Sequence, residues 1–283
     1  MTNETRTILD GLIFSECPRW YDDRLWFSDM LDRKVIAVDP EGNAETIAGI
    51  PGQPGGLGFL PDGRLLIVSM TDQLLLRLDP DGLKQVADLS GLAVGNCNDM
   101  VVDVQGRAYI GDWGFVEFDP KAPKDTAHLI MVTPEGQASI VASKVFFPNG
   151  AVITPDNKTL IVAESMAARL VSFDIEDDGS LINYSVWADL GEDVMPDGIC
   201  LDAEGAIWVT NSKGNDVIRF RKGGEVADRI MLSLRAYSCI LGGPDRKDLY
   251  LTTAAPGMFA DLQSKRSGCI EVIKVDVPGA GLP

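Results

Sequence analysis

A turn-and-strand segment recurs six times along the chain, and this repeat restricts the possible folds more than any other feature. Each copy is a tight turn followed by a short strand of β-branched, aliphatic or aromatic residues, as in residues 59–68 (FLPDGRLLIV). The turn residues are Asp23, Gly63, Gly106, Asn157, Gly205 and Arg246. Subtracting their numbers gives spacings of 40, 43, 51, 48 and 41 residues. A unit of this length, repeated along the whole chain, is typical of β-propeller blades.

A second turn follows inside most of the repeats, as in residues 79–82 (DPDG) and 133–136 (TPEG). Two hairpin turns leave room for four short strands in each repeat. The sequence therefore predicts an all-β fold, a six-bladed β-propeller with four antiparallel strands per blade, formed by residues 1–283 as a single domain. We expect the segment 5–12 to pair with the last blade, near residues 268–275, because this pairing would remove an exposed sheet edge.

Composition narrows the functional classes. The chain has 42 acidic and 25 basic residues, a formal net charge of −17, which disfavours nucleic-acid binding because phosphate contacts dominate that affinity. No apolar run reaches the length of about 18 residues that a membrane helix needs. We expect a cytoplasmic protein, a monomer or small homo-oligomer, whose partner is a small molecule rather than nucleic acid or a membrane.

Cysteine and histidine usage excludes several kinds of chemistry. The five cysteines are scattered and form no Cys-x-x-Cys pair, which argues against a disulfide framework and against a thiolate zinc site. The single histidine, His128, lies in an apolar segment that reads as a strand. Nothing nearby suggests a Ser-His-Asp or Cys-His mechanism, and a histidine-rich metal site is excluded.

Polar side chains recur at one phase of the repeat. The residues eight positions before the turn residues are Gly55, Asn98, Asn149, Asp197 and Ser238, and Glu16 lies seven before the first. Equivalent positions of the repeats lie at the same level along the axis of a propeller. These residues should therefore surround one end of the central channel. The set lacks Arg and Lys, and two buried carboxylates without a counter-charge would be costly.

A divalent cation would remove that cost. Oxygen donors from Glu16, Asn98, Asn149 and Asp197 suit a hard cation, so we expect one divalent metal, with calcium favoured and zinc, manganese, magnesium or iron as alternatives. Each short motif alone, such as Asn-Gly, is more often an ordinary turn, and the agreement in phase favours the metal site. A second set of polar residues, here called the second polar phase, follows about six positions after the turn residues; its members are Asp29, Ser69, Asp112, Glu164, Asn211 and Thr252. We expect most of them to cap strands, with a place at the rim or behind the metal ligands as the alternative.

The motifs at these positions resemble those of the senescence marker protein 30/gluconolactonase family, which includes luciferin-regenerating-enzyme-like proteins. The matching segments are 15–20 (SECPRW), Asn98-Asp99 with Gly106-Arg107, 148–150 (PNG), 196–208 (PDGICLDAEGAIW) and 237–253 (YSCILGGPDRKDLYLTT). The resemblance covers the chain from about Leu12 to Ala254.

This resemblance implies metal ligation by Glu16, Asn149 and Asp197, with Asn98 as a fourth ligand or a substrate contact, and it implies that Asp197 is the general base. It also points to departures. Asn96 stands where sugar-lactone members usually have arginine, and Met100 replaces a glycine. We expect substrate contacts from Asn98, Asn96, Met100, Trp113 and Met195, in a pocket made less polar by these residues together with Phe115 and Phe146.

The function expected on this basis is metal-assisted hydrolysis of a small lactone. One alternative is hydrolysis of a phosphotriester or phosphofluoridate at the same metal site, and another is a non-enzymatic calcium-binding propeller. A third is a bond-forming relative of the strictosidine synthase type. No organic cofactor motif is present, because the Gly-rich segment 52–58 lacks the strand-to-helix context of a dinucleotide loop.

Overall fold

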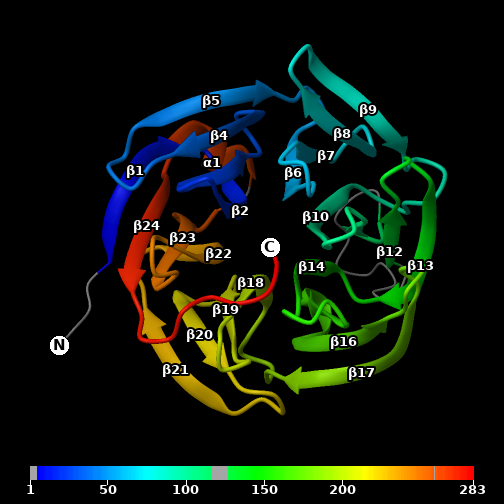
Figure 1. Cartoon of the computed structure of the whole chain (residues 1–283). Helices are drawn as coiled ribbons and strands as arrows, with labels where there is room; N and C mark the ends of the chain where they lie inside the picture. The colour runs from blue at the N-terminus through cyan, green and yellow to red at the C-terminus, as the bar shows by residue number, and fades with distance from the viewer. Residues whose placement is uncertain (1–4, 116–126, 258) are drawn as a thin grey trace.

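The computed structural model describes residues 5–115, 127–257 and 259–283. In this part of the chain, six four-stranded antiparallel sheets are arranged around one central axis, so the predicted six-bladed β-propeller is confirmed (Figure 1). Each blade runs from an inner strand beside the axis to an outer strand at the rim, in chain order for five of the six blades.

From the innermost strand outward, blade 1 holds β2 (Ser15–Tyr21), β3 (Arg24–Asp29), β4 (Lys34–Val38) and β5 (Ala44–Gly49); blade 2 holds β6 (Pro54–Phe59), β7 (Leu65–Ser69), β8 (Leu74–Asp79) and β9 (Gly82–Asp88); blade 3 holds β10 (Cys97–Val102), β11 (Ala108–Asp112), β12 (Ala127–Val132) and β13 (Ala138–Val145). In the same order, blade 4 holds β14 (Pro148–Ile153), β15 (Thr159–Glu164), β16 (Arg169–Ile175) and β17 (Leu181–Asp189); blade 5 holds β18 (Pro196–Leu201), β19 (Ile207–Asn211), β20 (Asp216–Phe220) and β21 (Val226–Met231); blade 6 holds β22 (Arg235–Gly242), β23 (Asp248–Ala254), β24 (Gly268–Lys274) and β1 (Arg6–Leu12).

The ring closes through the first strand of the chain. β1 pairs antiparallel with β24, with Arg6 opposite Val272 and Leu12 opposite Gly268, and becomes the outer strand of blade 6. This confirms the expected pairing of the segment 5–12 with the last blade. The edge of β24 is thereby covered by a strand from the other end of the chain.

The turns form where the repeat predicted them. All six turn residues from Asp23 to Arg246 have positive φ, between 54° and 85°. The glycines of the second turns, Gly42, Gly82, Gly136, Gly179 and Gly223, have positive φ as well. Glycine and asparagine tolerate this region far better than other residues, so the hairpins follow directly from the local sequence.

The core lies between the blades. Inner strands such as β18 are buried along their whole length, whereas the outer strand β17 exposes most of its side chains. Large buried side chains, including Trp208, Tyr109 and Phe220, fill the spaces where neighbouring sheets pack face to face. This packing holds the inner strands, and any side chain they direct toward the axis, in fixed positions.

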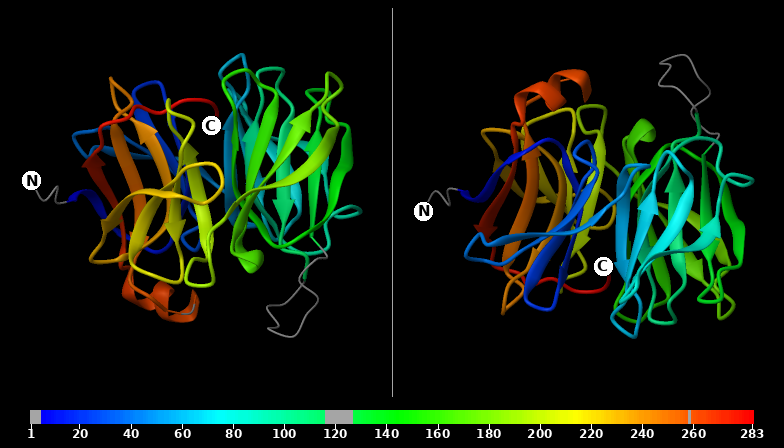
Figure 2. Two further views of the ribbon diagram at one scale, coloured as in Figure 1. Left: turned by 90° about the horizontal axis from the view of Figure 1, so that it is seen from below. Right: turned by 90° about the horizontal axis from the view of Figure 1, so that it is seen from above.

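The two ends of the ring differ (Figure 2). The short helix α1 (Phe259–Lys265), which follows β23, lies at one end, and the C-terminal segment 276–283 crosses the other. This segment hydrogen-bonds in turn to Arg246 in blade 6, Leu201 and Ala203 in or beside blade 5, and Ile153 in blade 4. It therefore ties three blades together at the end of the channel opposite α1.

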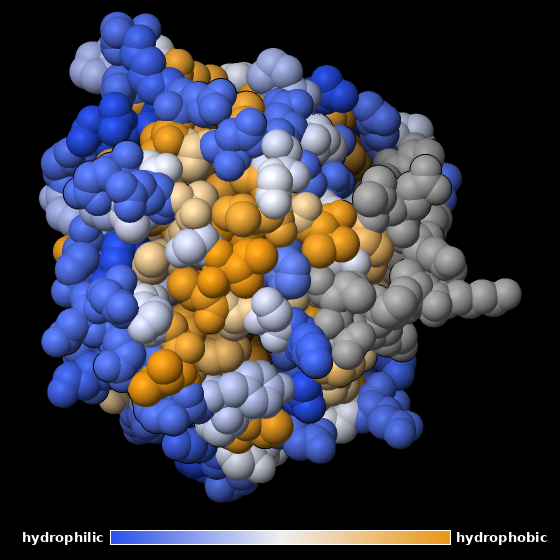
Figure 3. Space-filling model, turned by 90° about the vertical axis from the view of Figure 1, so that its right-hand side faces the viewer, coloured by the Kyte–Doolittle hydropathy of each residue, from blue (hydrophilic) through white to orange (hydrophobic). Residues whose placement is uncertain are grey.

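Apolar side chains gather in the middle of the side shown in Figure 3, with hydrophilic ones around them. Among the outer strands, β13 exposes Ile140, and β17 exposes Ile182, Tyr184 and Val186. In the described part of the chain, no helix has the length and apolarity that crossing a membrane requires.

Candidate metal and active site

The six inner strands carry the residues that lie seven or eight positions before the turn residues, here called the first polar phase. Glu16, Gly55, Asn98, Asn149 and Asp197 each occupy the second position of an inner strand, and Ser238 lies near the start of β22. Pairing with the second strand of the blade is irregular at this point in all six blades, for example between Pro148 and Ala151 in blade 4. Such bulges re-aim side chains and are common beside active sites.

Two glycines in the motifs serve close strand packing rather than turns. A Cβ atom on Gly150 would lie 2.5 Å from the backbone nitrogen of Ile199 and 2.8 Å from the carbonyl oxygen of Asp197. A Cβ on Gly198 would collide with Ser238. The Asn-Gly and Asp-Gly pairs thus let the inner strands of blades 4, 5 and 6 approach one another closely, which brings their polar neighbours together.

Two carboxyl groups at this end of the channel lack a basic partner. Glu16 and Asp197 are buried, at 8% and 9% exposure, and no ion pair in the described part of the chain reaches either of them. Burial, followed by the charge of Asp99, raises the pKa of Asp197 to about 7. Burial, followed by the charges of Asp197 and Asp99, raises the pKa of Glu16 well above its usual range.

The two asparagines are held with their amide nitrogens engaged. Asn98 donates from Nδ2 to the carbonyl oxygen of Pro148 at 3.1 Å. Asn149 donates from Nδ2 to Oγ of Ser165 at 3.3 Å, and this hydroxyl donates to the carbonyl of Pro196 at 2.6 Å. The Asn149 and Ser212 side chains also act on Asp197, where their hydrogen bonds oppose the rise in its pKa. Because each amide nitrogen donates to a protein oxygen, the amide oxygen points away from that contact. A cation ligand requires such an oxygen.

The polar set itself contains no arginine or lysine, but a buried arginine lies beside it. Arg19, buried in β2, ion-pairs with Asp99 at 2.7 Å and donates to the carbonyl oxygen of Leu57 at 2.8 Å and to that of Pro18 at 2.7 Å. Asp99 in blade 3 takes the place that Gly150 and Gly198 hold in blades 4 and 5. Its carboxylate raises the pKa of both Glu16 and Asp197, while the guanidinium that balances it is committed to Asp99 and to backbone carbonyls.

The second polar phase caps the loops that lead into the inner strands, in line with the prediction. Asp29 accepts hydrogen bonds from the backbone N–H groups of Ile13 and Phe14, at 3.1 and 2.9 Å. Asn211 accepts in the same way from Met195 at 3.0 Å, and Glu164 from Phe146 at 3.3 Å. These side chains hold the segments just before Glu16, Asp197 and Asn149.

The expected substrate contacts divide into two groups. Asn96, Trp113 and Met195 are half-buried at the end of the ring where the polar phase lies. The backbone N–H of Trp113 donates to the backbone carbonyl of Asn96 at 2.9 Å. Met100, in contrast, is fully buried in the apolar core between blades 2 and 3, so its side chain has no surface to offer a substrate. Phe146 packs beneath the guanidinium of Arg169, 5.1 Å from the ring centre, rather than with the other aromatic residues.

No three His, Cys, Asp or Glu side chains come together as a metal-binding group in the residues that the structure describes. A cation at this end of the channel would therefore have two carboxylates, Glu16 and Asp197, and would take its remaining protein donors from the amides of Asn98 and Asn149. Carboxylate and amide oxygens are the donor set that calcium uses in proteins. His128 lies on β12, as expected, and takes no part in this group.

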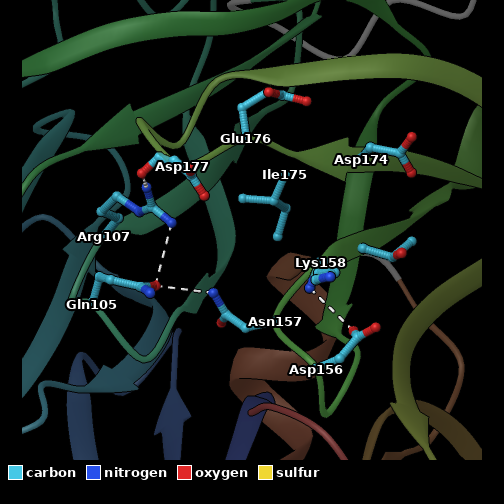
Figure 4. A pocket seen from close by; sticks show the side chains of 10 residues that line it. Gln105, Arg107, Asp156, Asn157, Lys158, Asp174, Ile175, Glu176 and Asp177 are labelled. Carbon is cyan, nitrogen blue, oxygen red and sulfur yellow. Dashed lines mark hydrogen bonds between the residues drawn. The ribbon is translucent and has the colours of Figure 1, made fainter.

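A polar groove of about 650 Å³ lies at the opposite end, beside the turns of blades 3 and 4 (Figure 4). Its side chains bind one another: Asn157 donates to Oε1 of Gln105 at 2.9 Å, and Arg107 is held by Asp103 and by the carbonyl oxygen of Asp177. The groove is thus a set of satisfied surface groups, distant from the residues of the first polar phase.

Comparison with known proteins gives relatives of similar length. The chain is 28% identical to regucalcin of Danio rerio over 273 residues, covering 90% of this chain and 88% of that protein. It is 25% identical over 257 residues to pentonolactonase XacC of Haloferax volcanii, covering 88% and 84%. The structure of a luciferin-regenerating enzyme superposes with a TM-score of 0.85 at 18% identity, covering 99% of this chain and 98% of the other, which supports the fold.

The family model described as the SMP-30/gluconolactonase/LRE-like region matches residues 14–255, from the segment just before Glu16 to the end of β23. The match spans every strand that carries the first polar phase. The chain therefore belongs to the SMP-30/gluconolactonase/LRE-like family.

Proposed function

We propose that the protein is a divalent-metal-dependent hydrolase that opens a small lactone. The observation that carries this proposal is the pair of buried carboxyl groups, Glu16 and Asp197, placed beside two oriented amides with no basic side chain bound to either. Buried carboxyl groups of this kind are stable as anions only beside positive charge. The pentonolactonase relative and the family itself support a lactone as the substrate.

The residues fit a hard cation, and we propose calcium as the metal. Glu16, Asn149 and Asp197 would hold it, with Asn98 as the fourth protein donor or as a substrate contact. The chain is related to regucalcin, and a regucalcin of solved structure from Agrobacterium tumefaciens is described as a calcium-binding protein. When bound, such a cation polarises a carbonyl oxygen and lowers the pKa of water.

The residues of the chain would then carry out ester hydrolysis. Asp197 accepts a proton from the water whose oxygen attacks the lactone carbonyl carbon. The ring C–O bond breaks, the proton passes to the departing alkoxide oxygen, and the product is the open hydroxy acid. Asn98 would orient the ester, and burial excludes bulk water from the carboxyl groups.

Hydrolysis of a lactone panel after chelator treatment tests the proposal. The panel contains γ-butyrolactone, γ-nonalactone, dihydrocoumarin and glucono-δ-lactone, each assayed with EDTA-treated protein and again after addition of calcium, manganese or zinc. We expect turnover of at least one lactone that disappears with EDTA and returns with metal. Metal binding by calorimetry without turnover of any lactone would refute the activity, and a phosphotriester such as paraoxon would then be the next substrate to assay.

A further inference from the structure

Three aromatic rings form a stacked group beside the proposed site. The Phe147 ring lies 6.0 Å from Trp113 and 5.6 Å from Phe115, at interplanar angles of 25° and 27°. Trp113 and Phe115 are 6.1 Å apart. All three residues are half-buried, so none of them is enclosed in the core although the rings pack against one another.

The backbone places this group at the end of the channel where the polar residues lie. Phe147 directly precedes Pro148, whose carbonyl accepts the amide of Asn98, and it is two residues before Asn149. The backbone N–H of Trp113 donates to the backbone carbonyl of Asn96, two residues before Asn98. The rings therefore lie beside the first residues of β10 and β14, the two strands that carry the proposed asparagine donors.

The backbone of Phe147 is strained. Its φ is +56°, a region that bulky side chains rarely adopt because the Cβ atom crowds the backbone. Its carbonyl accepts a hydrogen bond from the N–H of Ser165 at 3.2 Å, which fixes the strained residue beside the hydroxyl that holds Asn149. Strained residues of this kind concentrate at ligand-binding positions, where the surrounding structure maintains them.

Among the described residues, apolar side chains lie in the segments next to the aromatic group, beside the half-buried amide of Asn96. Met195, which is half-buried, directly precedes β18 as Phe147 precedes β14. Met166, also half-buried, follows β15 and donates its backbone N–H to the carbonyl of Phe146. The guanidinium of Arg169 in blade 4 is occupied by Glu164, Tyr184 and the ring of Phe146. Thioether and aromatic surfaces bind apolar groups and give up no hydrogen bonds when they do so.

We propose that Trp113, Phe115 and Phe147 form an aromatic wall that binds the apolar substituent of the substrate, so that the preferred lactones carry an aryl or alkyl group and few hydroxyl groups. This inference rests on the proposed lactonase function. It assigns the wall to selectivity, through contacts with the part of the substrate that does not react.

Kinetics on the same panel tests the assignment. We expect kcat/KM for γ-nonalactone and dihydrocoumarin to exceed that for glucono-δ-lactone by at least about tenfold, since binding of a few methylene groups alone supplies that much discrimination. Trp113→Ala should lower the ratio of kcat/KM for γ-nonalactone to that for γ-butyrolactone by about tenfold, mainly through KM. The matched control is Phe146→Ala, which removes a ring that faces Arg169 and should keep this ratio.

Phe147→Asn separates binding from folding. Asparagine tolerates positive φ, so this variant should have a higher melting temperature than the wild type while its preference for γ-nonalactone falls. A loss of activity that is equal on all lactones, or a loss that parallels a fall in melting temperature, would assign the rings to folding and overturn the proposal. So would a wild-type preference for glucono-δ-lactone.

Calorimetry with an unreactive analogue keeps the two proposals distinguishable. N-hexyl-2-pyrrolidinone, an alkyl lactam, should bind the calcium-loaded wild type at least about tenfold more tightly than it binds the Trp113→Ala variant. If the lactam binds in this way but no lactone is hydrolysed, the lactonase proposal is refuted and the proposed aromatic wall is supported. If lactones are hydrolysed and the lactam binds both proteins equally, the proposed aromatic wall is refuted and the lactonase proposal is supported.

Discussion

Asp197 lies at the start of β18 and Asp202 directly follows its end, and the two are buried in opposite settings. Asp202 accepts a hydrogen bond from Nε of Arg219 at 2.6 Å and two more from the backbone of Glu204 and Ala206. Asp197 has no basic partner, and burial raises its pKa to about 7. The same contrast holds between Glu16, at the end with Asp197, and Asp103, which is paired with Arg107 at the end with Asp202.

The difference separates groups that hold the fold from groups kept for a ligand. A buried carboxylate that is paired and hydrogen-bonded costs the fold little, and removing its partner is expensive. A buried carboxylate without a counter-charge lowers stability until something positive binds. Removing a buried negative charge should therefore raise the stability of the metal-free protein at the end with Asp197 and lower it at the end with Asp202.

Asp197→Asn is expected to give the largest effect. Removing the proposed general base should lower kcat for the best lactone by about 10²–10⁴-fold. Because the substitution also removes an unpaired buried charge, the metal-free variant should melt at or above the wild-type temperature at pH 8. Lactone kinetics and thermal unfolding in EDTA measure the two effects, and full retained activity would exclude Asp197 as the base.

Asp202→Asn should give the opposite result. It leaves the buried guanidinium of Arg219 with only Glu204 as an acidic partner, and we expect a loss of about 3–5 kcal/mol in the free energy of unfolding, with kcat nearly unchanged in the protein that remains folded. Urea denaturation measures the loss. The control is Glu225→Gln in the exposed pair with Arg221, which should change stability by less than about 1 kcal/mol. Equal losses in the Asp202 and Glu225 variants would mean that burial does not strengthen the pairing.

Glu16→Gln tests whether the second unpaired carboxyl group binds the proposed metal. The side chain keeps its shape but loses its charge, so calcium affinity should fall by at least about tenfold, the lower end of what even indirect ligand contacts cost. Isothermal titration calorimetry with EDTA-stripped protein provides the measurement. An unchanged dissociation constant would place the metal elsewhere.

The smallest expected effect is a dependence of stability on pH. The folded pKa of Asp197, about 7, lies above its ordinary value of 3.8, so the folded protein holds a proton that the unfolded chain releases. The stabilisation is complete below about pH 4 and is lost as the pH rises toward and through 7. The metal-free protein should therefore melt a few degrees lower at pH 8 than at pH 6, apart from other groups, and Asp197→Asn should reduce this difference.

Calcium should also reverse this dependence, because the cation competes with the proton for the same carboxyl groups. Differential scanning calorimetry at both pH values, with EDTA and with calcium, compares the four states. A melting temperature of the metal-free protein that rises between pH 6 and pH 8, in the wild type but not in the Asp197→Asn variant, would contradict the raised pKa.

The repeat allowed the blades and the height of the polar residues to be predicted because both depend on local sequence. Positive φ at Gly63 or Asn157 is a property of those residues, and it sets the hairpins. The pairing of Arg19 with Asp99 joins positions far apart in the sequence and leaves no local pattern. The burial of Met100 was missed because the bulge between Cys97 and Met100 changes which residues face the core.

The C-terminal segment was also missed, for a different reason. It binds through backbone groups, such as the reciprocal hydrogen bonds between Ile153 and Leu282, and such bonds need no particular side chains. The metal, the roles of the ligands and the aromatic wall remain predictions, because they concern molecules that the chain binds rather than the chain itself.

The closure of blade 6 by β1 has a consequence for biosynthesis. β1 leaves the ribosome long before its partner β24, so the ring stays open until β24 has been made. Until then β1 has no partner and the nascent blades expose unpaired edges, a state that favours aggregation. The segment 276–283 emerges later still and then fastens blades 4, 5 and 6. The ring is thus closed only once β24 has been made, and the end that carries Asp202 is fastened after that.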